Sequence, residues 1–409
     1  MALIGPRGRR ALGLAQRFLE EQRALVEHVL ETRRSVRLTP EGGARGAVLL
    51  SCVLEAFDED RVKNLRAHTN VWESCQIAET FLELGFEVDV ISFRNYGYLV
   101  RRPYDVLVSS RTNLELLAPQ VGPDCLKLLH ADVAHVLFHN AAEANRLLAL
   151  QQRRGVTLAP RRYSAPNLAI EHADCATVNG NAFTMETYAY AGKPVHRVHK
   201  SALVSLPSPA DRDFDAARRR FVWLSSDGLV HKGLDLVLEA FAELPHLELL
   251  VAAPLEQEPD FEAAYERELH GLPNIEVLGW IDVTSSRFEQ LARTCAATVY
   301  PSCSEGGGGS VLDCLHAGLV PIVTREASVD IDDFGSELPA AGVEEIKEAV
   351  TALSETPANE LRERAVAAWE HARANHTRKR FAEDYRDIAE RLLAYGPTGA
   401  PAVTAAPGA

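Results

Sequence analysis

The chain has 409 residues, of which 46% are hydrophobic and 24% are charged. This composition is typical of a globular protein, and the length is enough for two separate hydrophobic cores. The formal net charge of -14 argues against nucleic-acid binding, because phosphate backbones are bound by lysine and arginine.

The cysteines and the apolar runs indicate a soluble protein of a reducing compartment. Seven cysteines lie far apart, without a C-x-x-C pair or histidines at zinc-site spacing. No apolar run has the length of a membrane span, and Gln16 and Arg17 interrupt the N-terminal apolar stretch before it could act as a signal peptide. We therefore expect a cytoplasmic protein with reduced thiols and no integral membrane segment.

Residues 1–40 are predicted to form an N-terminal extension. Within it, residues 11–32 place apolar side chains on one face of an amphipathic helix. We expect this helix to pack on the body of the protein or on a partner subunit. Because eight arginines and only four glutamates fall in residues 1–40, peripheral contact with a membrane is the alternative.

Residues 41–205 alternate between short β-rich runs and segments of helical period. One helix is expected at 72–84, with Gly85 as its stop. The predicted strands are 47–53, 88–92, 106–109, 126–130 and 176–179. Such alternation predicts a parallel sheet with helices on its faces, which is a Rossmann-like domain.

A second Rossmann-like domain is predicted over residues 206–376, after a Pro- and Asp-rich passage typical of an interdomain linker. Its predicted strands are 221–225, 247–252, 275–278, 297–300 and 320–324, and its helices lie near 234–244, 261–269, 286–294 and 310–317. We expect a last helix at 377–395 to pack back on the first domain. The Pro/Ala/Gly-rich tail, 396–409, is predicted to be disordered. The sequence thus predicts an α/β protein in which two Rossmann-like domains face each other across a cleft.

Residues 300–318 read as strand, glycine-rich turn and helix, with four consecutive glycines. The glycines let the backbone approach a ligand, and the start of the helix offers N–H groups that favour an anion. Glu305 enters the turn, and Asp313 follows about two helical turns later, so both carboxylates can face one cleft. Carboxylates beside an anion site suit a ligand with hydroxyls and phosphates, such as a nucleotide sugar. A flexible glycine loop with two solvated acids is the alternative.

This segment resembles the acid-x7-acid signature of the large bacterial family of retaining GT-B glycosyltransferases, the glycosyl transferases group 1 type, with Asp313 at the second acidic position. Residues 226–235 and 273–280 resemble the first strand-loop-helix and the middle strand of that family's donor domain. The resemblance implies the GT-B fold and transfer of a sugar with retention of anomeric configuration. It also implies a nucleotide-sugar donor in the C-terminal domain and an acceptor mainly in the N-terminal one.

The resemblance assigns roles to individual residues. Lys232 matches the lysine that pairs with the donor diphosphate, and Glu305 matches the acid that holds hydroxyls of the transferred sugar. The implied donor-binding residues are Gly307, Gly308, Gly309, Ser310 and Asp313, the last gripping the ribose. One departure is Asp227, which stands where many members carry an arginine that shares the diphosphate with the lysine. Either Asp227 points away, or Arg325 or another cation substitutes, or the donor is held differently.

The N-terminal domain offers further candidates. His130 follows a predicted strand and matches a histidine that the family places near the reacting sugar carbon, with His135 and His139 as weaker matches and a structural histidine as the alternative. Asn70 and Asn181 are expected to border the cleft, toward donor phosphate or acceptor, although Asn70 also suits a helix N-cap.

Neither a metal nor a cofactor is expected. The D-x-D pattern occurs at 58–60, 211–213 and 330–332, which shows that it is unspecific here, and the resemblance implies catalysis without a bound metal. The nucleotide sugar is a substrate, and the acceptor could be a saccharide, a lipid-linked molecule or a small metabolite. The alternatives are a sugar-nucleotide epimerase of the same fold, a glycogen-type phosphorylase, and a non-catalytic nucleotide-sugar-binding protein, which Asp227 favours most.

Overall fold

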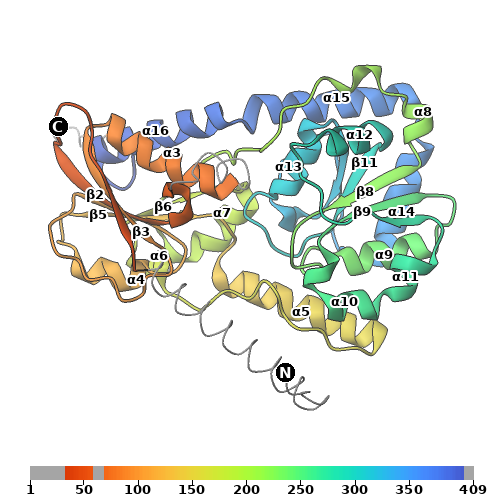
Figure 1. Ribbon diagram of the computed structural model, residues 1–409, viewed down its shortest axis with the longest axis horizontal. Helices are drawn as coiled ribbons and strands as arrows, with labels where there is room; N and C mark the ends of the chain where they lie inside the picture. Colours follow the sequence, from red (N-terminus) through yellow and green to blue (C-terminus); the bar gives the residue numbers. More distant parts are fainter. Residues whose placement is uncertain (1–32, 59–68, 400–409) are drawn as a thin grey trace, which may run out of the picture.

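The computed structural model describes residues 33–58 and 69–399, which form two α/β domains lying side by side (Figure 1). The N-terminal sheet has seven strands in the order β1-β3-β2-β4-β5-β6-β7. They are β1 (Ser35–Leu38), β2 (Gly46–Cys52), β3 (Phe86–Ser92), β4 (Val106–Ser110), β5 (Leu126–Ala131), β6 (Cys175–Val178) and β7 (Val195–Arg197). Only β1 is antiparallel to its neighbour.

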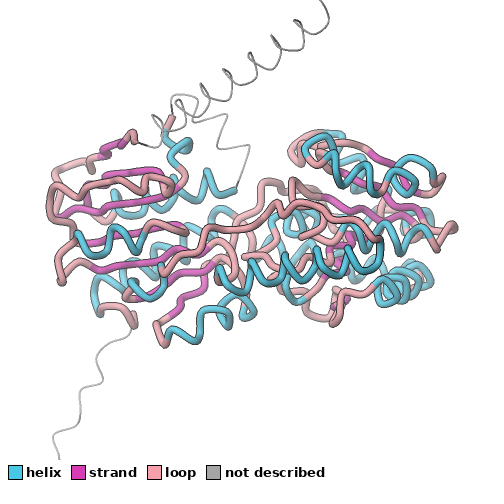
Figure 2. Tube along the Cα trace, turned by 90° about the horizontal axis from the view of Figure 1, so that it is seen from below, coloured by secondary structure: helices cyan, strands magenta, loops and turns pink. Residues whose placement is uncertain are grey.

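The C-terminal sheet has six parallel strands in the order β10-β9-β8-β11-β12-β13. They are β8 (Arg220–Leu224), β9 (Glu248–Ala252), β10 (Ile275–Val277), β11 (Ala297–Tyr300), β12 (Val320–Val323) and β13 (Ser336–Glu337). In the view of Figure 2, the strands of each domain lie between helices.

The helices cover both faces of each sheet. In the N-terminal half they are α3 (Thr69–Glu83), α4 (Leu114–Leu117), α5 (Val136–Arg154), α6 (Ala169–His172) and α7 (Ala182–Tyr188). The others are α8 (Phe214–Ala217), α9 (Leu234–Ala242), α10 (Pro259–Ala264), α11 (Glu266–Gly271), α12 (Ser286–Thr294), α13 (Gly309–His316), α14 (Val343–Glu355), α15 (Ala358–Asn375) and α16 (Arg378–Tyr395). Val48, Leu49 and Leu50 on β2 are fully buried, as expected for a parallel sheet covered on both faces.

The predicted fold class is confirmed, and each of the ten predicted strands is present within two residues of its expected bounds. The prediction missed β1, β7 and β13, which are two to four residues long and have no fully buried residue. β1 begins at Ser35, so the N-terminal sheet starts before the expected boundary at residue 41. The helix expected at 11–32 and most of the tail expected at 396–409 lie outside the described residues.

The C-terminal helix α16 returns to the N-terminal domain (Figure 1). Phe381 and Tyr385 are buried in the same apolar cluster as β2, β3 and α3. Trp72 of α3 meets Phe381 edge-on, with ring centroids 5.7 Å apart. The chain therefore returns from the C-terminal domain to the N-terminal one between α15 and α16.

The seven cysteines are all free, and six of them are buried. Within residues 33–58 and 69–399, no helix is long and apolar enough to cross a membrane.

Candidate active site in the interdomain cleft

A cleft of about 1080 Å³ separates the domains and is lined by residues of both. On the C-terminal side it lies over the loops that follow β8 and β11, where ligands of parallel α/β sheets usually bind. On the N-terminal side its wall comes from the start of α3 and from the segments after β4 and β5. The geometry therefore suits a ligand held between the two domains.

The glycine-rich loop between β11 and α13 forms the floor of this cleft. A Cβ at Gly306 would lie 2.6 Å from Val133 Cα, so only glycine lets the loop lie against the N-terminal domain. Gly307 has φ +86° and also lines the cleft, together with Gly309 and Ser310. Gly308 does not line it, and its N–H donates to Ala327 O at 2.9 Å. The amide of Gly308 is therefore not free for a donor phosphate, contrary to the prediction.

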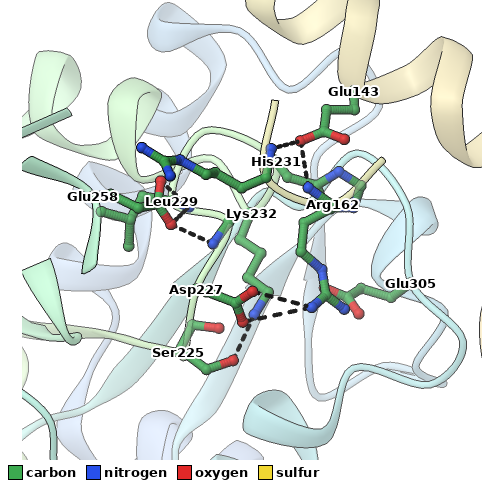
Figure 3. Close-up of polar contacts among 12 residues, drawn as sticks. Glu143, Arg162, Ser225, Asp227, Leu229, His231, Lys232, Glu258 and Glu305 are labelled. Atoms are coloured by element: carbon green, nitrogen blue, oxygen red, sulfur yellow. Dashed lines mark hydrogen bonds and ion pairs between the residues drawn. The ribbon is translucent and has the colours of Figure 1, made fainter. Parts of the chain in front are cut away.

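Lys232 lies in the loop between β8 and α9 and lines the cleft. Its side chain extends toward Asp227 (Figure 3). Its Nζ donates to Ser226 Oγ at 3.0 Å. Burial lowers the pKa of Lys232 to about 8, an effect that the neighbouring Glu305 partly opposes. Among the described residues, the hydrogen-bond partner of the Lys232 ammonium is a hydroxyl and not a carboxylate.

Glu305 stands at the entrance of the glycine-rich loop and accepts hydrogen bonds from Tyr300 Oη at 2.9 Å and Ser302 Oγ at 3.3 Å. Burial works against its charge, but Lys232 and Arg162 hold the pKa of Glu305 below its ordinary value. It is therefore an anion that can accept hydrogen bonds from sugar hydroxyls.

Asp313 lies on α13, and its Oδ1 accepts from the backbone N–H of Leu203 at 2.9 Å. Burial raises the pKa of Asp313 to about 7. Its carboxyl group lines the same cleft as Lys232 and Glu305, so the structure brings these three predicted residues together.

Arg162 is a site residue that the sequence prediction missed. It follows α5 and lines the cleft, and its Nη1 lies 3.5 Å from both carboxylate oxygens of Asp227 (Figure 3). Its Nε is buried without a hydrogen-bond partner. Arg162 therefore places a cation beside Asp227, at the position where the family resemblance implies an arginine. Arg325 instead pairs with Glu186 and does not line the cleft.

The backbone around Arg162 is held by two side chains of α5. The N–H groups of Arg161 and Arg162 both donate to Glu143 Oε1 at 2.8 Å. His139 Nε2 donates to the Arg162 carbonyl at 2.7 Å, so its Nδ1 accepts from Ser304 Oγ at 3.0 Å. His139, a weaker catalytic candidate, therefore fixes Arg162 and joins α5 to the loop that carries Glu305.

The N-terminal wall of the cleft holds a polar cluster. Arg111 Nε donates to both oxygens of Asp132 at 3.0 Å, and Asn70 Nδ2 donates to Asp132 Oδ2 at 3.0 Å. Lys200 Nζ donates to Asn70 Oδ1 at 3.3 Å. Although burial favours its neutral form, Arg111 holds the pKa of Asp132 well below its ordinary value. Asn70 thus lines the cleft as expected, among three charged residues that the sequence prediction did not include.

His130 is buried and is not among the residues that line the cleft, contrary to the expected position beside the reacting sugar. Its Nδ1 is hydrogen-bonded to Thr177 Oγ1 at 2.9 Å, and its ring packs edge-on against Phe381 and Tyr385 of α16. Burial lowers the pKa of His130 to about 4. Side chains alternate along a strand, so His130 shares the face of Leu128, which is covered by α16.

Asn181 also lies outside the cleft lining, contrary to the prediction. Its side chain caps α7 by accepting from Phe183 N at 3.1 Å, and it accepts from Ser328 Oγ of the other domain at 3.0 Å. Asn181 therefore joins the domains at a direct contact. His135, the other weaker candidate, is the N-cap of α5.

In the D-x-D pair at 330–332, Asp330 forms an ion pair with Arg197, and Asp332 Oδ2 lies 3.2 Å from His371 Nδ1. Over the described ranges, no group of three or more His, Cys, Asp or Glu side chains is placed to hold a metal ion.

Residues 218–356, which include the glycine-rich loop, match a family model described as "Glycosyl transferases group 1". No curated protein sequence matches the chain significantly.

Several solved structures share the two-domain architecture. Sucrose-phosphate synthase from Thermosynechococcus elongatus is similar with a TM-score of 0.57 and 14% identity, covering 86% of this chain and 100% of that one. The Anabaena protein HepE, described in complex with UDP and glucose, has a TM-score of 0.51, 14% identity and the same coverage. A glycosyltransferase from Rickettsia africae has a TM-score of 0.54 and 11% identity, again with 86% and 100% covered. These likenesses show that the chain has the GT-B fold.

Proposed function

We propose that this protein is a glycosyltransferase, which takes a sugar from a nucleoside-diphosphate sugar bound in the cleft and transfers it to an acceptor with retention of anomeric configuration. The observation that carries the proposal is the meeting of Lys232, Arg162 and Glu305 at the start of the glycine-rich loop. The match of residues 218–356 to a glycosyl transferase family and the UDP in the Anabaena structure support a donor of this class.

In this proposal the diphosphate lies between the glycine-rich loop and the two cations. The N-terminus of α13 carries a partial positive charge, and Lys232 adds a full one. Arg162 shares its charge with Asp227 and adds N–H donors. When the bond from the anomeric carbon to the diphosphate oxygen breaks, negative charge grows on that oxygen. Preorganised cations stabilise this charge in the transition state, and they supply what a metal ion would otherwise supply.

The acceptor hydroxyl oxygen forms its bond to the same face of the sugar that the diphosphate leaves, and its proton passes to the departing phosphate oxygen. The anionic Glu305 holds hydroxyls of the transferred sugar, and Asp313 holds those of the ribose. These roles follow from the family resemblance and from the position of Glu305 and Asp313 in the same cleft as Lys232.

A non-catalytic binding protein is the competing proposal, because Asp227 would repel a diphosphate. The ion pair between Arg162 and Asp227 weakens this argument, since the acid is neutralised by a cation at the same place. Asp227 then orients Arg162 instead of removing the donor site.

The test is thermal unfolding of the wild type with UDP, GDP, dTDP and their sugars. A ligand present at a hundred times its Kd adds roughly 2.7 kcal/mol to the stability of the folded state. We expect one nucleotide to stabilise the wild type and Lys232→Ala to lose most of the gain. Lys379→Ala, the same substitution on the exposed face of α16, should keep it. If no nucleotide stabilises the wild type, the donor-site proposal is wrong.

A further inference from the structure

A second pocket, of about 300 Å³, lies in the N-terminal domain beside the cleft. The two cavities share Arg111, Asp132, Val133 and Arg162. The volume falls at the lower end of the range for small-molecule sites, roughly 300–1,000 Å³. Because the cavities share a wall, a ligand in this pocket lies next to the place where the donor sugar would react.

The pocket is cationic in a protein that is strongly anionic as a whole. Its lining contains four arginines and a single carboxylate, that of Asp132; the arginines are Arg94, Arg111, Arg161 and Arg162. The start of α5, a helix of 19 residues, also lines it at His135 and Val136, which adds the positive end of a helix dipole. These groups favour an anion.

The four arginines differ in whether a carboxylate within the protein already pairs with them. Arg111 pairs with Asp132, and Arg161 with Asp260 at 2.5 Å. Arg162 is only loosely paired with Asp227, and its Nε is buried without a hydrogen-bond partner. Arg94 stacks over the Phe93 ring at 4.8 Å and has no acidic partner within the part of the chain that the structure describes. Arg94 and Arg162 therefore keep N–H donors available for a ligand.

We propose that this pocket binds the acceptor and that the acceptor carries a phosphate monoester, as a sugar phosphate does. This inference rests on the proposed transferase function. Arginine N–H groups match the oxygens of a phosphate in pairs, and Arg94 and Arg162 both line this pocket. Arg94 lines only the second pocket, whereas Arg111 and Asp132 line both cavities. An acceptor whose phosphate is held by Arg94 can therefore present a hydroxyl beside the Arg111–Asp132 pair toward the donor sugar.

The test is a calorimetric titration at saturating UDP, which fills the donor phosphate site. Glucose 6-phosphate, inorganic phosphate and glucose are the three probes. We expect glucose 6-phosphate to bind at least about tenfold more tightly than glucose, because a charged hydrogen-bond partner adds affinity of that order. Inorganic phosphate should also bind, and both phosphates should bind in the same pocket.

Two variants change the charge of the pocket without touching the donor residues. Arg94→Gln removes the unpaired cation, and Asn167→Asp adds a carboxylate at the lining while keeping an oxygen to accept from Ala169 N. Each should weaken glucose 6-phosphate binding about tenfold. Arg101→Gln, an exposed arginine of the same domain outside both cavities, is the matched control and should leave affinity unchanged.

Equal affinity for glucose and glucose 6-phosphate would overturn the proposal, as would full phosphate affinity in Arg94→Gln and Asn167→Asp, or no binding of any probe. UDP binding tests the donor site independently, and Arg94→Gln should bind UDP as tightly as the wild type does. Failure of the wild type to bind UDP counts against the proposed donor site. Phosphate binding that depends on Arg94 is then still a result about the second pocket.

Discussion

At the scale of single residues, Asp227 and Arg162 form a charge pair that spans the two halves of the sequence. We predict that Arg162→Ala weakens UDP binding about 10- to 100-fold, because a charged hydrogen bond contributes roughly 1.5–3 kcal/mol. In the double variant Arg162→Ala with Asp227→Arg, the cation returns on the other side of the pair, and much of the affinity should return with it. Calorimetry with UDP measures both. An Arg162→Ala variant with unchanged affinity would remove Arg162 from the donor site.

The lowered pKa of Lys232 makes the predicted affinity for UDP depend on pH. Burial lowers this pKa to about 8, while Glu305 and Asp227 on one side and Arg162 on the other modulate it. The cation needed for diphosphate binding is present below pH 8 and is lost as the pH rises above it. We predict that the Kd for UDP increases by up to tenfold per pH unit between pH 8 and 9.5, since protonation and binding are linked. Lys232→Arg, which stays charged, should bind UDP with a flat profile, and a flat profile in the wild type would contradict the assignment.

We predict that the carboxyl group of Asp313 lowers the stability of the folded protein while it contributes to UDP binding. In the unfolded chain the carboxyl has its ordinary pKa of 3.8, whereas burial raises the pKa of Asp313 in the folded state to about 7. The folded state is therefore penalised as the pH rises from 4 to 7, by up to about 4 kcal/mol. Asp313→Asn should be more stable than the wild type at pH 8 in urea unfolding, with little difference at pH 4. It should nevertheless bind UDP more weakly, and a variant destabilised at pH 8 would show that the charged form is stabilised in place.

At the scale of elements, the glycine-rich loop depends on close contact with the opposite domain. A Cβ at Gly306 would meet the backbone at Asp132 and Val133, which cannot move like a side-chain end. We predict that Gly306→Ala lowers the melting temperature and weakens binding of the nucleotide sugar. Gly97→Ala, where the added Cβ has nothing within 4 Å, is the control. If the two variants behave alike, the contact between loop and wall is not tight.

The elements also show what the sequence could predict. The buried parallel strands are continuous apolar runs, so the sequence predicts ten of them, whereas β1, β7 and β13 are too short to give a pattern. Lys232, Glu305 and Asp313 lie within local strand-loop-helix motifs, so the sequence could predict that they line one cleft. The position of Arg162 in the site could not be predicted in this way, because Arg162 is 65 residues from Asp227 in the sequence and only the fold brings the two together. The buried position of His130 is not predictable from the sequence, because a place on a strand does not tell which face of the sheet α16 covers.

At the scale of the whole molecule, α5 binds the two domains together. It begins at the N-terminal wall of the cleft and extends along α10 of the other domain (Figure 1). Arg154 at its end forms a bidentate ion pair with Glu268, with N–O distances of 2.9 and 3.0 Å, and Arg153 pairs with the buried Asp235 at 2.6 Å. Arg162, just beyond α5, is therefore placed on the donor side of the cleft although its sequence belongs to the N-terminal half.

The two domains contribute different residues to the cleft. The C-terminal domain contributes the glycine-rich loop and Lys232, and the N-terminal domain contributes the Arg111–Asp132 wall and the second pocket. Arg162 lines both cavities and so lies between the proposed donor and acceptor.

The most direct measurement is NMR of the anomeric proton of a nucleotide sugar incubated with the protein, using the nucleotide that stabilises it best. Sugar released to water or to an added acceptor should first appear with the anomeric configuration of the donor, and Lys232→Ala should release it far more slowly. Lys379→Ala should release it at the wild-type rate. Initial release of the opposite anomer, or no release of sugar by a protein that binds the nucleotide, would contradict the assignment as a retaining glycosyltransferase.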